Sequence, residues 1–147
     1  MYKIVELSKN YRQQVLDLIA TDHLRPEGIL DEGTRYWGAF CENELAGVIG
    51  CEYEGAFGLL RSALVHKKYR SQGIAGLLTE TLISTAKDEK LEAVYLFSTD
   101  AGGYWTKLGF KPVGVAEVIE KLSHAPQVNL FRELGWLPTE AAYKLKL

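Results

Sequence analysis

The sequence predicts an α/β domain in which helices flank a mixed β-sheet. Three short strand-like segments follow one another with tight turns, which is typical of an antiparallel meander. The hydrophobic period then changes from two residues to about 3.6, as in an amphipathic helix. A short apolar run after this helix is typical of a strand covered on both faces. At 147 residues, a single domain over residues 1–147 is the expectation.

The first half of the chain predicts a strand, a helix and the meander. Residues 2–7 alternate and are rich in β-formers, and Ser8 or Asn10 can cap the helix that reaches Ile19. Residues 21–34 contain proline and glycine and predict a loop, in a place from which it could cover a binding cleft. The three strands of the meander are expected over residues 36–41, 45–53 and 57–65.

The second half predicts further helices and strands in alternation. A helix is expected over residues 74–86 and a buried strand over 93–98, after which Asp100 can cap a short helix that ends at Gly109. Residues 110–118 predict a strand. Pro126 suits the first turn of a helix that continues to Leu134, and residues 141–147 predict a closing strand.

Composition excludes several classes of partner. The formal net charge is −2, so the chain lacks the broad positive field of a general nucleic-acid binder. No stretch approaches the roughly 20 apolar residues that cross a bilayer, and the first residues turn polar too early for a signal peptide, so a cytoplasmic protein is expected. Two cysteines without CxxC spacing and three scattered histidines predict no metal site.

A basic, glycine-containing turn precedes the helix at residues 74–86. The segment supplies charge and small residues in the order Lys67, Lys68, Arg70, Gly73, Ala75 and Gly76. The first N–H groups of a helix have no partner inside it and carry partial positive charge, so such a turn can cradle a phosphate. The alternative is that the glycines serve helix packing and the basic side chains are only solvated.

Two motifs resemble those of the Gcn5-related N-acetyltransferase (GNAT) family. RSQGIA at residues 70–75 is similar to the family signature R/Q-x-x-G-x-G/A, and residues 98–110 (STDAGGYWTKLGF) resemble its later motif. The resemblance implies a mixed, mostly antiparallel, splayed sheet flanked by helices. It also implies an acetyl-CoA-dependent N-acetyltransferase in which a small-molecule amine attacks the thioester directly, and a possible homodimer.

The resemblance also implies where acetyl-CoA binds. Its pyrophosphate is expected on the turn and helix start, at Arg70, Ser71, Gln72, Gly73, Ile74, Ala75 and Gly76. Its pantetheine is expected to pair with the main chain around Leu64 and Val65, where main-chain groups can polarise the thioester carbonyl. Ser98 holds the position of a pantetheine-contacting asparagine and can still form a hydrogen bond.

One position departs from the family. Trp105 stands where the general-acid tyrosine is usual, and an indole cannot act as that acid near neutral pH. Tyr104 is the neighbouring candidate, although adjacent helical residues point about 100° apart. Alternatively the CoA thiolate leaves unassisted or through water, since a thiol pKa near 8.5 makes it a fair leaving group. A non-catalytic CoA-binding sensor or interaction module is the alternative function.

The acceptor side of the site is predicted around Arg61. An unpaired guanidinium in this apolar strand would be costly, and a two-residue turn at 55–56 places Glu52 diagonal to it. The two residues either form a structural ion pair, or Arg61 binds an anionic group of the substrate while Glu52 acts as general base. Ser62 points to the other face in a regular strand and is a weaker candidate. Trp37 either lines the acceptor pocket or belongs to the core.

A looser similarity links short segments, among them residues 58–65 (GLLRSALV), to the arsenic-resistance-associated GNAT subgroup. That similarity implies an anionic, amino-acid-like amine as substrate.

Overall fold

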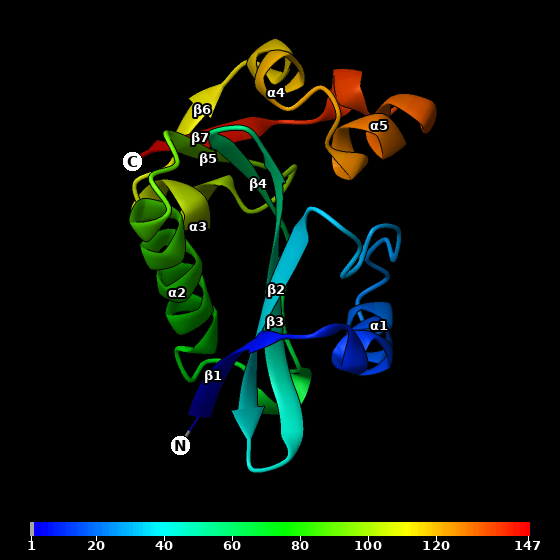
Figure 1. The fold of residues 1–147 in the computed structure, drawn as a ribbon, viewed down its shortest axis with the longest axis vertical. Helices are drawn as coiled ribbons and strands as arrows, with labels where there is room; N and C mark the ends of the chain where they lie inside the picture. The colour runs from blue at the N-terminus through cyan, green and yellow to red at the C-terminus, as the bar shows by residue number, and fades with distance from the viewer. Residues whose placement is uncertain (1) are drawn as a thin grey trace. The chain divides into compact units, whose positions relative to one another are not determined.

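A computed structural model describes residues 2–147. In this part of the chain seven strands form one sheet in the order β1-β2-β3-β4-β5-β7-β6 (Figure 1). The strands are β1 (Tyr2–Leu7), β2 (Thr34–Cys41), β3 (Glu44–Glu54), β4 (Phe57–Val65), β5 (Ala93–Phe97), β6 (Lys111–Val113) and β7 (Ala142–Lys146). β4 and β5 run parallel, whereas β1–β2, β5–β7 and β6–β7 are antiparallel pairs. The predicted mixed, mostly antiparallel sheet is confirmed.

Five α-helices accompany these strands. They are α1 (Arg12–Ala20), α2 (Ile74–Asp88), α3 (Gly102–Lys107), α4 (Val115–Lys121) and α5 (Pro126–Glu133). Short 3₁₀ turns lie at Lys9–Tyr11, Lys67–Tyr69 and Leu137–Thr139. No helix within residues 2–147 is long and apolar enough to span a membrane.

The chain divides into two compact units. The first comprises Met1–Cys51 and Arg61–Thr85, and the second comprises Glu52–Leu60 and Ala86–Leu147. Both β3 and β4 therefore contribute residues to each unit. The single domain over residues 1–147 stays a prediction.

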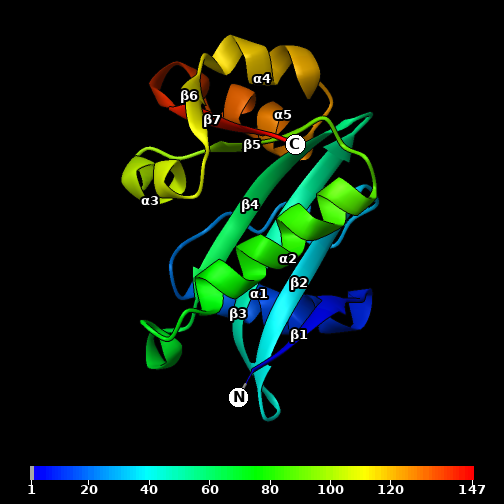
Figure 2. The same cartoon turned by 90° about the vertical axis from the view of Figure 1, so that its left-hand side faces the viewer.

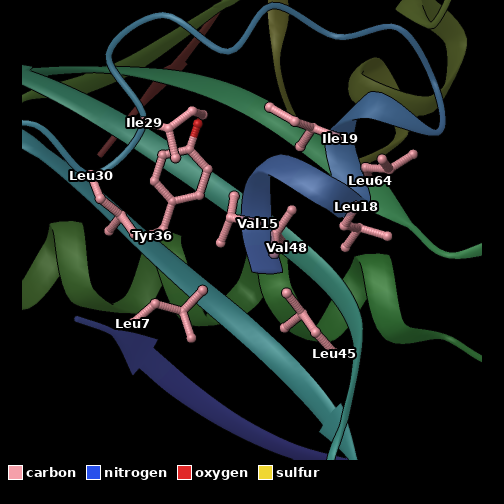
Figure 3. Close-up of a cluster of buried hydrophobic side chains, with 10 residues drawn as sticks. All are labelled: Leu7, Val15, Leu18, Ile19, Ile29, Leu30, Tyr36, Leu45, Val48 and Leu64. Atoms are coloured by element: carbon pink, nitrogen blue, oxygen red, sulfur yellow. The ribbon is translucent and has the colours of Figure 1, made fainter. Parts of the chain in front are cut away.

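In the first unit, α1 and α2 lie on opposite sides of the strands (Figures 1 and 2). The α1 side holds a hydrophobic cluster, drawn in Figure 3, to which five elements (β1, α1, β2, β3 and β4) and the loop after α1 contribute. Its members are Leu7, Val15, Leu18, Ile19, Ile29, Leu30, Tyr36, Leu45, Val48 and Leu64. The predicted Ser8 or Asn10 cap of α1 is wrong: a 3₁₀ turn intervenes, Tyr11 becomes the N-cap, and no side-chain capping bond forms.

The loop between α1 and β2 is anchored at its second half. Arg12 donates from Nε to the carbonyl of Ile29 at 3.0 Å and from Nη2 to the carbonyl of Leu30 at 3.1 Å. The same guanidinium pairs with Asp31. Because the Ile29 and Leu30 side chains are buried, this half of the loop belongs to the core of the first unit.

The second unit packs α4 and α5 against β4, β5 and β7. The cluster contains Leu59, Ala93, Tyr95, Val118, Leu122, Ala125, Val128 and Ala142. Figure 1 shows α3 and α4 on opposite sides of β5 and β7. The Tyr95 hydroxyl donates to Glu117 at 2.5 Å, and Lys144 lies 2.9 Å from the same carboxylate oxygen. Burial and the Glu117 carboxylate raise the pKa of Tyr95 to about 12.

The predicted strand over residues 110–118 is wrong beyond its first half. β6 ends at Val113, and α4 begins at Val115. From Val115 onward the apolar residues recur at helical spacing through Leu122, which is fully buried. Asp100 also does not cap α3, because the N-cap is Ala101.

Candidate functional site

The turn from β4 into α2 is built by two residues in the left-handed region. His66 starts it, and its Nδ1 accepts the Lys68 N–H at 3.1 Å. Ser71 then has φ of 65° and Gly73 has φ of 83°, after which α2 begins at Ile74. Glycine adopts such a conformation without steric cost, so Gly73 suits the sharp entry into the helix.

The start of α2 presents a row of open main-chain donors. The main-chain N–H groups of residues 71–76 donate no hydrogen bond to any described part of the chain. The first helical hydrogen bond is donated by the N–H of Leu77 to the carbonyl of Gly73, at 3.1 Å. A Cβ at Gly73 or Gly76 would meet nothing within 4 Å. The packing alternative therefore does not account for these glycines, and the helix start has the open space and donors that an anion needs.

Arg70 fixes the turn to the end of β4. Its Nε donates to the main-chain carbonyl of Val65 at 2.9 Å, and the residue is exposed. The carbonyl around which the pantetheine was expected thus already accepts a bond. Lys68 lies 3.5 Å from Glu44, which also accepts from Tyr69. The bond from Tyr69 is the main cause of the lowered pKa of Glu44.

β4 pairs with β5 only over its first half. The pairs run from Phe57–Ala93 to Leu60–Leu96, and β4 continues to Val65. Leu64 belongs to the hydrophobic cluster of the first unit, and Val65 is half-buried. The expected pairing of pantetheine with Leu64 and Val65 stays a prediction.

Residues after β5 organise the start of α3. The Ser98 hydroxyl accepts the Ala101 N–H at 3.0 Å in the turn that precedes α3, whose N-cap, Ala101, makes no side-chain capping bond. Trp105 is buried, with its ring 5.6 Å from that of Phe110. Tyr104 is 40% exposed and packs edge-on against Trp105. Of these two adjacent residues, Tyr104 is therefore the one that solvent or a ligand can reach.

Arg61 is buried in the first unit and bonded to its neighbours. Its Nε donates to the Ser62 hydroxyl at 3.3 Å and its Nη2 donates to the carbonyl of Arg25 at 3.1 Å. The Tyr36 hydroxyl also donates to Ser62, at 2.8 Å. The expectation for Ser62 is wrong because the strand is not regular there: Ser62 has φ of 55°, which turns its side chain toward Arg61. Sequence patterns carry no signal for this turn.

Glu52 lies in the second unit and is fully buried. Its carboxylate accepts the Gln127 N–H at the start of α5, at 2.9 Å, and Glu54 accepts the His124 N–H at 2.7 Å. Neither contact was foreseen. Because Glu52 and Arg61 belong to different units, their predicted pairing stays a prediction.

Trp37 is buried and lies apart from the Tyr36–Ser62 contact. Adjacent strand residues point to opposite faces, and Tyr36 belongs to the cluster on the α1 side. The Trp37 ring instead lies under the Arg35 guanidinium, 5.2 Å away. Within residues 2–147 no group of three or more His, Cys, Asp or Glu side chains could hold a metal ion.

Residues 1–110 match the Acetyltransferase (GNAT) family. The chain belongs to this family. The GNAT resemblance, the fold and the acyltransferase class predicted from the sequence are thereby confirmed. A search of curated proteins found no match to this chain.

Solved structures share the fold over the full length of this GNAT chain. A GNAT acetyltransferase from Staphylococcus aureus Mu50 has a TM-score of 0.77 at 18% identity, covering 100% of this chain and 99% of that one. N-acetylglutamate synthase from Neisseria gonorrhoeae, complexed with coenzyme A and N-acetyl-glutamate, has a TM-score of 0.82 at 14% identity, covering 100% of this chain but 35% of that one. An N-acetyltransferase from Thermoplasma acidophilum, complexed with coenzyme A, has a TM-score of 0.71 at 13% identity, covering 100% and 99%.

Proposed function

We propose that this GNAT protein is an acetyl-CoA-dependent N-acetyltransferase whose acceptor is a small amine carrying an anionic group. The observation that carries the proposal is the open row of N–H donors from Ser71 to Gly76, next to the exposed Arg70. This arrangement suits a pyrophosphate because helix N-termini and guanidinium groups both favour phosphate oxygens. The coenzyme A bound in two of the structures with the same fold supports this choice of cosubstrate.

In the proposed reaction the neutral amine attacks the thioester carbonyl. The C–N bond forms as the C–S bond breaks, the amine proton passes to water, and the thiolate takes a proton. Main-chain groups near Leu64 and Val65 are proposed to polarise the carbonyl, and Ser98 to contact the pantetheine. Tyr104 is the candidate acid because it is exposed, whereas the indole of Trp105 is buried and has no proton to give at neutral pH.

Arg61 is proposed to bind the anionic group of the acceptor. It is a cation in an apolar strand, and its Nη2 donates to a neutral carbonyl, which a carboxylate would replace with a stronger, charge-assisted bond. The N-acetyl-glutamate held by the Neisseria synthase supports an amino-acid-like acceptor. Glu52 is less suited to act as base, since it is fully buried and holds the N–H of Gln127. These contacts support a structural role for Glu52 at the start of α5.

A thiol-release screen tests the proposed reaction. The purified protein and acetyl-CoA are incubated with amino acids, including arsenical and phosphinate ones, and each is paired with the amine that lacks its acid group. Release with the acids and little with their partners is expected. Tyr104→Phe should lower kcat about tenfold or more without changing the KM for acetyl-CoA. An unchanged kcat would mean that water, and not Tyr104, protonates the CoA thiolate.

The second candidate function is a CoA-binding module without turnover, which Trp105 at the usual acid position favours. Saturable acetyl-CoA binding without thiol release from any amine would support this candidate and contradict the first. Release with one acceptor eliminates it.

A further inference from the structure

A hollow of about 410 Å³ opens in the first unit, beside the second half of α1. Its sides come from α1, from the turn between β2 and β3, and from the residue after β4. It is lined by two side-chain amides and by Asp17, Leu18, Thr21, Glu44, Leu45 and His66. The volume is that of a site for a small molecule. None of these residues has a part in the proposed acetylation.

The charge of this lining is negative. Asp17 on α1 and Glu44 at the start of β3 contribute carboxylates, and no lysine or arginine is among the described residues that line the hollow. His66 does not offset them. Its Nδ1 accepts the Lys68 main-chain N–H at 3.1 Å, so the imidazole carries its one proton on Nε2 and is neutral. A cation in the hollow therefore meets two opposite charges and no basic lining residue.

The α1 side of the hollow has acceptors to spare. Asp17 Oδ1 accepts from the Gln13 amide at 2.8 Å, and within residues 2–147 Asp17 pairs with no cation. Thr21, one helical turn further on, donates its hydroxyl to the Leu18 carbonyl at 2.6 Å, which leaves the lone pairs of its oxygen as acceptors. An ammonium group has three N–H donors and no acceptor, so it suits this side of the hollow.

Glu44 offers a second point of attachment for a cation. It accepts from Tyr69, and the Lys68 ammonium lies 3.5 Å away, with the side chains of Lys68 and Glu44 both more than half exposed. Such an exposed ion pair contributes little free energy, so a bound cation can compete with Lys68. Leu18 and Leu45, two members of the cluster in Figure 3, give the hollow an apolar surface that an alkyl chain can cover.

We propose that this hollow binds a small alkyl diamine in its doubly protonated form. One ammonium group is bound by Asp17 and Thr21, the other is bound by Glu44, and the alkyl chain contacts Leu18 and Leu45. The inference does not depend on the proposed acetyl-CoA site, which uses other residues.

Calorimetric titration with putrescine and cadaverine, at physiological salt and without acetyl-CoA, tests the proposal. At least one diamine should bind saturably, about tenfold or more tighter than the monoamine of equal chain length, butylamine or pentylamine. Asp17→Asn can keep the Gln13 contact but removes the charge, so it should weaken diamine binding about tenfold or more. Asp22→Asn, at an exposed aspartate outside the hollow, is the matched control and should leave the affinity unchanged.

Lys68→Ala gives a readout that a structural role of the lining would not move. Removing the ammonium that competes for Glu44 should tighten diamine binding about threefold. Arg70→Ala, in which acetyl-CoA binding should weaken, is expected to keep the diamine affinity of wild type, so this proposal and the proposed function fail separately. Equal affinities for diamine and monoamine, an unchanged diamine affinity in Asp17→Asn, or a wild-type protein that binds neither diamine overturns the proposal.

Discussion

Arg70 donates its Nε–H to the carbonyl oxygen of Val65, 2.9 Å away, and so ties the turn before α2 to the last residue of β4. The side chain is exposed, and the residues that follow it in the chain, 71–76, carry the open N–H groups of the helix start. One side chain thus closes the turn and adds charge beside the proposed pyrophosphate position.

Arg70→Ala should weaken acetyl-CoA binding about tenfold or more, since a charge-assisted bond to phosphate is lost. The free energy of unfolding should fall by at most about 1 kcal/mol, because the Arg70–Val65 bond is exposed. Calorimetry and urea unfolding measure the two effects. Lys87→Ala removes an equal charge from the last turn of α2 and should leave binding unchanged. Equal affinities of the two variants would contradict the role of Arg70.

Alanine at Gly73 and at Gly76 should affect folding with opposite signs. Gly73 has φ of 83°, so Gly73→Ala should lower the free energy of unfolding by about 1 kcal/mol. Gly76 lies in α2 with open space around it, so Gly76→Ala should raise it by about 0.5 kcal/mol. Gly76→Ala should nevertheless bind acetyl-CoA more weakly, because its methyl group enters that space. If Gly76→Ala were both more stable and tighter-binding than wild type, this would argue that acetyl-CoA does not occupy the space beside Gly76.

Glu52→Gln should act mainly on stability. The fully buried carboxylate accepts the N–H of Gln127, and a neutral amide holds that helix start less well, so the free energy of unfolding should fall by about 1–3 kcal/mol. The acid limb of the pH–rate profile should stay where it is in the wild-type protein. If Glu52→Gln kept its stability but lost the acid limb of the pH–rate profile, Glu52 would be the general base.

Glu117→Gln should change how stability depends on pH. The hydrogen bond from Tyr95 is the main cause of the lowered pKa of Glu117, with the bond from Lys144 next. A lowered folded-state pKa means that the stabilisation is present above the ordinary value of 4.5 and is lost as pH falls through the folded-state value. Urea unfolding should therefore find the variant about 1 kcal/mol less stable at pH 7 and nearly equal to wild type at pH 3.

Glu120→Gln is the matched control for Glu117→Gln. Glu120 lies on the same helix and its side chain is 74% exposed, so its loss should leave the pH dependence unchanged. A Glu117 variant that follows Glu120→Gln at every pH would show that the Tyr95–Glu117 bond does not stabilise the fold.

The fold was predictable where the hydrophobic period is long and regular. The strand over residues 57–65 and the helix from Ile74 follow directly from their patterns. The prediction for residues 110–118 is wrong because the strand Lys111–Val113 is too short to set a period and a helix follows at once from Val115, with Gly114 as its N-cap. At the start of α3, Asp100 had the chemistry of a cap, but the helix begins one residue later, with Ala101 at the N-cap.

The candidate site was predictable where a local motif carries it. The turn at residues 70–76 was found from its glycines and charges. The Tyr36–Ser62 contact was not, since its residues lie 26 positions apart and a single positive φ within a strand, that of Ser62, leaves no local pattern. The contact of Glu52 with Gln127 spans 75 positions and likewise leaves no local pattern.

Calorimetric titration of the protein with acetyl-CoA tests the central claim most directly. We predict saturable binding by wild type and by Ser84→Glu, which adds a charge at an exposed position of α2. Gly76→Glu, which puts a carboxylate into the open space at the helix start, should lose binding by about a hundredfold or more while still folding. Wild-type affinity in Gly76→Glu would contradict the claim that this helix start holds the cosubstrate.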